Sequence, residues 1–179
     1  MSESTSGDGV RIPAWKSMLD DETQVLRDRV FDYLFDLEVK KATRYQCFLA
    51  VLFLELDSGA MEGATARDGQ AGRDHLRVLA ELLRDELRST DIIGKVSDGL
   101  FSVLLHHADE VNTQRIGERL RRRIADYVFA REGEGHKTVS IGGACFPASG
   151  NFPADLQSEA LKMMERAKLE GGNKVYTAT

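Results

Sequence analysis

The sequence lacks a long hydrophobic run, has few cysteines and carries no excess of basic residues. No apolar run is long enough to span a membrane, and no segment has the form of a secretory signal. We therefore expect a cytoplasmic protein without a membrane partner. The 24 Lys and Arg residues are outnumbered by 29 Asp and Glu residues, and the resulting net charge of -5 argues against broad nucleic-acid binding.

The composition is that of a soluble globular protein with one hydrophobic core. Of the 179 residues, 42% are hydrophobic and 30% are charged. The two cysteines, Cys47 and Cys145, lie in apolar runs, which is typical of small core side chains in a reducing compartment. Residues 1–12 are predicted to be a disordered N-terminus. Residues 13–179 show no internal repeat and are predicted to form a single domain with an N-terminal helix.

Apolar residues at helical spacing predict four helices. Their ranges are 13–41, 75–88, 110–129 and 153–170. The expected buried stripes of the first and third helices are Leu26, Val30, Leu34 and Leu37, widened by Phe31 and Phe35, and Ile116, Leu120, Ile124 and Val128.

The remaining patterns predict strands and one long loop. Residues 46–57 form a near-continuous apolar run, which indicates a central strand buried on both faces. Two β-rich runs, 91–96 and 100–105, flank Asp98-Gly99, and this dipeptide favours a type I′ hairpin turn. Further strands are expected at 137–146 and 174–176, and a long loop at 58–73. The order predicts an α+β sandwich, with a mainly antiparallel central sheet and helices packed around it.

The most specific motif pairs two short segments. Arg88-Ser89-Thr90-Asp91 is followed, after five residues, by Ser97-Asp98-Gly99-Leu100-Phe101. This arrangement resembles the central signature of the GGDEF family, the bacterial diguanylate cyclases, in which an Arg-x-x-Asp product-binding site precedes a Gly-Gly-Asp/Glu-Glu-Phe hairpin. Further segments that resemble the family, in the family order, are Asp20–Thr23, Glu55–Asp57, Thr138–Gly142 and Ala167–Val175. The resemblance covers residues 20–176 and implies the GGDEF, or nucleotidyl cyclase-like, sandwich.

The catalytic half of the signature departs from the family pattern. Family members join two GTP molecules with the help of metal ions, which are held by an acid on the central strand and by the acid at the third signature position. Here these positions are Glu55 and Gly99, and glycine offers no ligand. The resemblance therefore implies an inactive domain that holds no metal and requires no cofactor. The degenerate active-site positions are Glu55, Asp57, Ser97, Asp98, Gly99, Leu100 and Lys168, the last a phosphate contact in the family.

The product-binding half is intact. In the family, the arginine and the aspartate of Arg-x-x-Asp bind cyclic di-GMP, and a second arginine comes from the helix after the hairpin. Arg88, Asp91 and Arg119 fill these positions. Arginine offers a planar fork to phosphate or to the guanine O6/N7 edge, and a carboxylate accepts from the guanine N–H donors. The resemblance therefore implies a receptor for cyclic di-GMP in bacterial second-messenger signalling.

Simpler interpretations stay open beside this one. In one alternative, Arg88 and Asp91 bind no ligand and form a solvated ion pair with each other. Arg122 and Arg123 fit a solvated helix face. Glu55 and Asp57 fit a cap on the end of the buried strand, and His106 and His107 fit the edge of the hairpin. The whole chain can also be a nucleotide-independent module for a protein partner or for homodimerisation, or a residual cyclase or GTP binder.

Overall fold

The central element of the structure, a computed structural model, is a mixed sheet. The structure describes residues 14–57, 70–97, 99–129 and 136–178, and in these residues six strands follow the order β1-β3-β4-β2-β5-β6. The three inner pairings are antiparallel, while β1 and β6 pair with their neighbours in parallel at the two edges. The predicted α+β fold with a mainly antiparallel sheet is confirmed. The strands are β1 Leu26–Arg27, β2 Leu49–Leu56, β3 Ile92–Ser97, β4 Leu100–His106, β5 Val139–Phe146 and β6 Val175–Thr177.

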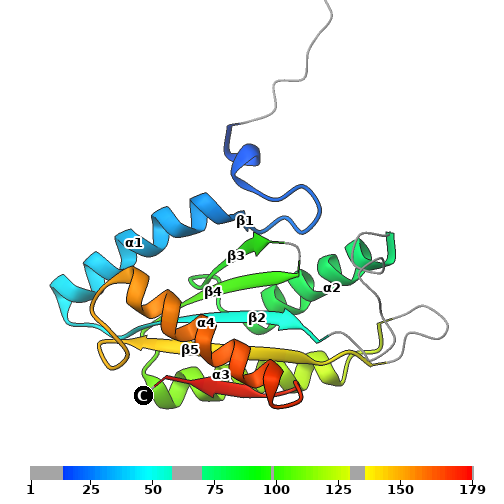
Figure 1. Ribbon diagram of the computed structural model, residues 1–179. Helices are drawn as coiled ribbons and strands as arrows, with labels where there is room; N and C mark the ends of the chain where they lie inside the picture. The colour runs from blue at the N-terminus through cyan, green and yellow to red at the C-terminus, as the bar shows by residue number, and fades with distance from the viewer. Residues whose placement is uncertain (1–13, 58–69, 98, 130–135, 179) are drawn as a thin grey trace, which may run out of the picture.

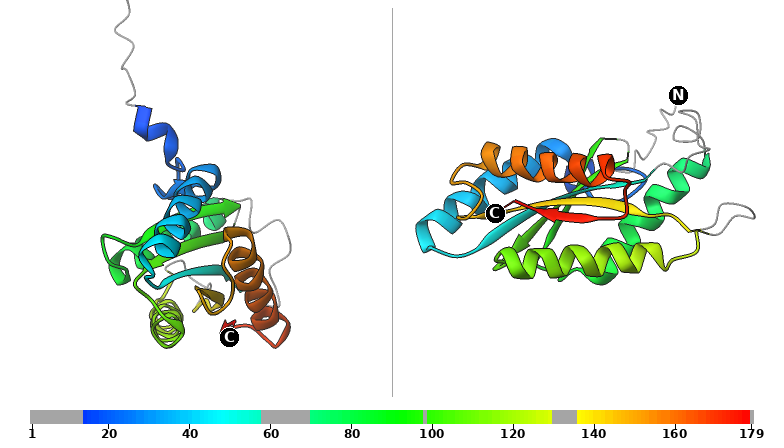
Figure 2. Two further views of the ribbon diagram at one scale, coloured as in Figure 1. Left: turned by 90° about the vertical axis from the view of Figure 1, so that its left-hand side faces the viewer. Right: turned by 60° about the horizontal axis from the view of Figure 1, so that its bottom comes forward.

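The long helices form one layer on each face of the sheet (Figures 1 and 2). Helices α1 (Asp28–Tyr45) and α4 (Pro153–Leu169) cover one face, and α2 (Gln70–Glu86) and α3 (Glu110–Ala125) cover the other. A short 3-10 helix, η1, spans Ala14–Met18. Within the described residues, no helix combines the length and the apolar character that a bilayer crossing requires.

Strand β2 needs both layers because neither of its faces is polar. Ala50, Leu52 and Leu54 pack toward α2 and α3, while Val51 and Phe53 pack toward α1 and α4. All five side chains are buried. The predicted central strand, buried on both faces, is therefore confirmed.

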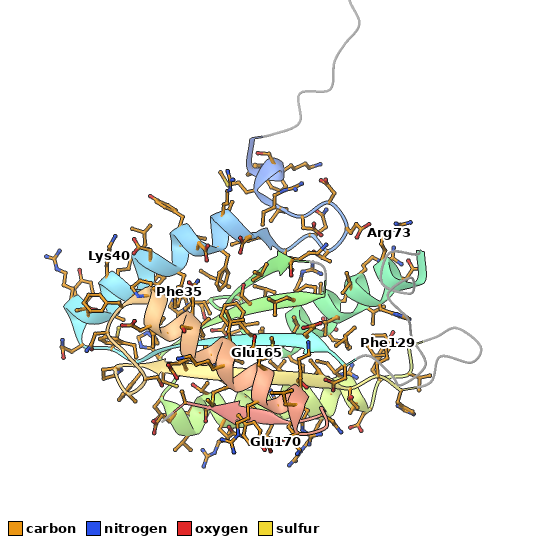
Figure 3. All side chains as sticks on the ribbon, in the orientation of Figure 1. Phe35, Lys40, Arg73, Phe129, Glu165 and Glu170 are labelled. Carbon is orange, nitrogen blue, oxygen red and sulfur yellow. The ribbon has the colours of Figure 1, made fainter. Side chains whose placement is uncertain are left out.

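The predicted helix over 13–41 is wrong in its first half. After η1 the chain turns, because the Asp20 carboxylate accepts hydrogen bonds from the backbone N–H and the hydroxyl of Thr23. Strand β1 then pairs with β3, and α1 begins only at Asp28. Its buried stripe also differs from the expected one, since Leu26 precedes the helix and Val30, Leu34 and Leu37 are only partly buried. The buried residues of α1 are Phe31, Phe35 (Figure 3), Val39 and Ala42.

The third predicted helix ends four residues early, at Ala125. Phe129 is buried against the rings of His75 and Tyr127, and the chain leaves the helix to place it there. Val128, expected in the buried stripe, is exposed and forms an isolated bridge with His136.

Other local predictions have mixed outcomes. Helix α2 starts earlier than expected, so it takes in residues 70–73 of the predicted loop, and it ends at Glu86. The rest of that loop, Asp98 and the predicted disordered N-terminus lie outside the described residues. Cys145 is a free core thiol, as expected, and burial raises its pKa to about 11. Cys47 is a free thiol that is only partly buried.

Helix α4 lies unusually close to the sheet because β5 carries a glycine beneath it. A Cβ added at Gly142 would lie 2.1 Å from the carbonyl oxygen of Ala160 and 2.1 Å from the backbone nitrogen of Met164. Backbone atoms cannot move aside as side-chain ends can. The adjacent Gly143 faces α3, and a Cβ there would meet only side-chain methyl groups, 2.8 Å away at the nearest, on Leu52.

We predict that Gly142→Ala destabilises the fold much more than Gly143→Ala. The first substitution pushes α4 off the sheet and should lower the free energy of unfolding by about 2–3 kcal/mol, and the second, which side chains can accommodate, by about 1 kcal/mol. Urea denaturation followed by circular dichroism measures both values. Equal losses for the two variants would contradict the proposed close approach of α4.

Candidate functional site

The turn between β3 and β4 brings Gly99 beside Glu55. Strand β2 pairs with β4 so that Glu55 lies opposite Leu100. Gly99 has φ +90°, the positive value expected at this turn. A Cβ added at Gly99 would lie 3.8 Å from Cγ of Glu55. An acidic side chain at position 99 would therefore stand next to the Glu55 carboxylate, whereas the glycine at this position brings no carboxylate.

The Glu55 carboxylate is paired with an ammonium group instead. Nζ of Lys168, in the last turn of α4, lies 2.6 Å from Oε2 of Glu55. The Glu55 side chain is 13% exposed and that of Lys168 is 39% exposed, so the pair is only partly screened by water. The close approach of α4 to the sheet thus places a positive charge against the acid that ends the central strand.

At the same corner, Asp57 joins the end of β2 to β5 and to the turn after α4. Its carboxylate accepts hydrogen bonds from the hydroxyls of Thr138 and Ser140, on and beside β5, and from the backbone N–H of Asn173. The turn after α4 lies so close that a Cβ at Gly172 would be 2.8 Å from Cγ of Asp57. These contacts match the interpretation of Asp57 as a cap on the buried strand.

The residues at this corner do not fit a divalent cation. A hard cation needs several oxygen ligands, most of them carboxylates. Glu55 is paired with Lys168, both Asp57 oxygens already accept hydrogen bonds, and Gly99 has no side chain. Across the described part of the chain, no group of three or more His, Cys, Asp or Glu residues is arranged to hold a metal ion.

An ion pair also lies at the start of α2. Nε of Arg73 (Figure 3) lies 3.4 Å from Oε1 of Glu22. An arginine here presents donors, whereas the guanine N1 and N2 groups require acceptors.

Arg88 and Asp91 lie together in the turn between α2 and β3. The backbone N–H of Arg88 donates to Oδ2 of Asp91 over 3.1 Å, and the N–H of Asp91 donates to the carbonyl of Arg88 over 3.0 Å. The Asp91 carboxylate therefore orders the turn, and the Arg88 side chain is exposed. In the described part of the chain, the Arg88 guanidinium has no hydrogen-bond or ion-pair partner, so the solvated Arg88–Asp91 ion pair is not formed.

His106, which the sequence analysis placed at the edge of the hairpin, also contacts Asp91. The backbone N–H of His106 donates to Oδ1 of Asp91 over 3.4 Å, and its ring Nε2 lies 3.3 Å from Oε2 of Glu38 on α1. His106 thus connects the Asp91 turn to α1, whereas His107 is exposed as expected.

The structure brings Arg119 to the same end of α2, although not to Arg88 itself. Its Nη2 donates to the carbonyl of Glu86 over 2.6 Å, and its Nε lies 3.3 Å from Oε2 of the Glu86 carboxylate. Nε of Arg123 lies 3.3 Å from the other oxygen, Oε1. Arg123 is therefore paired rather than simply solvated. Sequence reasoning missed Glu86, because its partner Arg119 is 33 residues away along the chain.

Comparisons with known proteins agree on one family. The family model for "Diguanylate cyclase, GGDEF domain" matches residues 17–174. The diguanylate cyclase DosC of Escherichia coli K12 is 29% identical over 157 residues, which are 86% of this chain and 33% of DosC. YhcK of Bacillus subtilis, an uncharacterized protein, is 29% identical over 131 residues, 70% of this chain and 35% of YhcK. The chain thus spans about a third of the length of these relatives.

Solved structures show the same fold. The GGDEF domain of YfiN (TpbB) from Pseudomonas aeruginosa has a TM-score of 0.81 at 23% identity, covering 90% of this chain and 94% of that one. The GGDEF domain of DgcB from Caulobacter crescentus, in complex with c-di-GMP, has a TM-score of 0.83 at 16% identity, covering 97% and 98%. Since the family model matches nearly the whole described chain, this protein belongs to the GGDEF family.

Proposed function

We propose that this chain is a catalytically inactive GGDEF domain that serves as a cytoplasmic receptor for cyclic di-GMP. The ligand binds at Arg88 and Asp91, with Arg119 contributing from α3. The observation that carries the proposal is the exposed Arg88 guanidinium, which has no partner among the described residues and stands beside a carboxylate held in place by two backbone N–H groups.

The chemistry of these groups suits the ligand. A guanidinium binds a phosphate or the O6/N7 edge of guanine through two parallel hydrogen bonds. Asp91 already accepts two hydrogen bonds, yet a carboxylate has about four acceptor positions and can still accept from guanine N1 and N2. The c-di-GMP complex of the DgcB domain supports the choice of ligand.

The residues at the opposite end of the hairpin support the proposed loss of cyclase activity. Phosphoryl transfer needs cations that neutralise the charge developing on the phosphates. The acid at the end of β2 is held by Lys168, and no second acid reaches it from Gly99 or Leu100. Without metal ions at this corner, the charge that develops on the GTP phosphates lacks the cations that this reaction needs.

A hollow at another part of the surface supports the second candidate, a module that binds a protein partner. It has a volume of about 250 Å³ and is lined by apolar residues that include Phe48, Val111 and Pro147. Exposed apolar side chains in such hollows are typical of interfaces. The complex of the cyclase SiaD with its activator SiaC, from Pseudomonas aeruginosa, is an example of a structural neighbour with a protein partner.

We predict that the double variant Arg88→Ala/Asp91→Ala weakens cyclic di-GMP binding by about 100-fold or more, because two bidentate contacts are lost. Isothermal titration calorimetry of the pure protein measures this, with circular dichroism as the test of folding. The matched control is Asp74→Ala/Arg77→Ala, which removes another Arg–Asp pair, three residues apart on α2. Unchanged affinity in the folded Arg88/Asp91 variant would overturn the site assignment.

We also predict that the pure protein with GTP and Mg²⁺ forms no cyclic di-GMP. Chromatography of the reaction mixture measures the product, and DosC serves as the positive control. Steady, enzyme-dependent product formation would establish a residual cyclase and would contradict the proposed inactivity. If neither GTP nor cyclic di-GMP binds, the protein-partner module becomes the better account of the chain.

A further inference from the structure

The cyclic di-GMP site contains an acidic side chain that the ligand must compete with. Glu86 ends α2, two residues before Arg88, and its carboxylate lies between the guanidinium groups of Arg119 and Arg123. Its side chain is 23% exposed, whereas that of Arg119 is 54% exposed. Of the two arginines proposed to bind the ligand, Arg88 is exposed and has no partner within the described ranges, and Arg119 is already paired with an internal anion.

We propose that Glu86 is an affinity-determining residue, a resident anion that occupies Arg119 until the ligand displaces it. This inference rests on the proposed function. Nε of Arg119 lies 3.3 Å from Oε2 of Glu86, and the phosphate of the ligand, which is also an anion, requires the same guanidinium. Binding therefore exchanges a carboxylate for a phosphate at Arg119, and the net gain is smaller than at an unpaired arginine.

The opposite role, in which Glu86 positions Arg119 for the ligand, is disfavoured by a second contact. Nη2 of Arg119 donates to the main-chain carbonyl of Glu86 over 2.6 Å. This hydrogen bond does not depend on the side chain at position 86, so it holds Arg119 at the end of α2 in its absence. The Glu86 carboxylate therefore competes with the ligand for Arg119 and is not needed to position that arginine.

Arg123 shares in the exchange. It contacts only Oε1 of Glu86 among the described residues, while Arg119 contacts Oε2. When the carboxylate is displaced, both guanidinium groups become available on the same side of α3, one helical turn apart. A ligand with two phosphates can use two such cations, whereas a ligand with one phosphate gains less from the exchange.

The test is Glu86→Gln, which keeps the shape of the side chain and removes its charge. Exposed ion pairs are worth little, so we expect cyclic di-GMP to bind about two- to fivefold more tightly than to the unchanged protein in calorimetry at low salt. The matched control is Glu81→Gln, an exposed glutamate on the same helix that has no partner within the described residues. It loses the same charge and should change the affinity by less than about 1.5-fold.

A double-mutant cycle separates competition at Arg119 from a general effect of charge or folding. In the Arg119→Gln background, Glu86→Gln should tighten binding less than in the unchanged protein, because only Arg123 is left for it to release. The same gain in both backgrounds would overturn the inference. So would binding by Glu86→Gln that is equal to or weaker than that of the unchanged protein, and either result would leave the receptor function standing. If cyclic di-GMP binds the Glu86→Gln variant but not the unchanged protein, Glu86 competes strongly enough to block the site. If it binds neither protein, the receptor function and this role of Glu86 are both overturned.

Discussion

The fold depends on a strand that has no polar face. Strand β2 presents apolar side chains in both directions, so water must be excluded from both sides of the sheet at its centre. One helix layer alone would leave half of these side chains exposed. The chain therefore carries two helices on each face. Gly142 of β5 lets α4 approach closely enough to exclude water from one of these faces. The polar residues of the candidate sites are found where this constraint ends, at the ends of the strands.

The hairpin of β3 and β4 separates the two functional regions. The positions proposed to be degenerate lie at its turn, and the Arg88–Asp91 segment precedes β3 at the other end. A strand of six residues extends roughly 20 Å, so substitutions in the two regions should have nearly additive effects. This separation gives a physical reason why the proposed binding site and the hairpin turn can vary independently. At both ends the charged groups have acquired internal partners, Lys168 for Glu55 and Glu86 for Arg119.

Sequence patterns predicted the inner strands, the hairpin and the last helix well, because long apolar periods and an Asp-Gly turn are local signals. They failed at 13–27, where a hydrogen-bonded turn and a two-residue strand leave no period to detect, and at Val128, where burial of Phe129 ends the helix. The motif located Arg88, Asp91 and Arg119, but it could not reveal their partners. Glu55 and Lys168 are 113 residues apart, and Arg119 and Glu86 are 33 apart. Such pairings are set by how helices pack on the sheet and leave no trace in local spacing.

The two edge strands of the sheet are very short, two residues in β1 and three in β6. A long edge would expose a row of unpaired backbone donors and acceptors, onto which a strand from another molecule can add. Edges of this length offer few such groups. Neighbouring copies of the domain, or domains fused to it, can therefore be crowded together with little tendency to join through their sheets, and any assembly that they form has to rely on side chains.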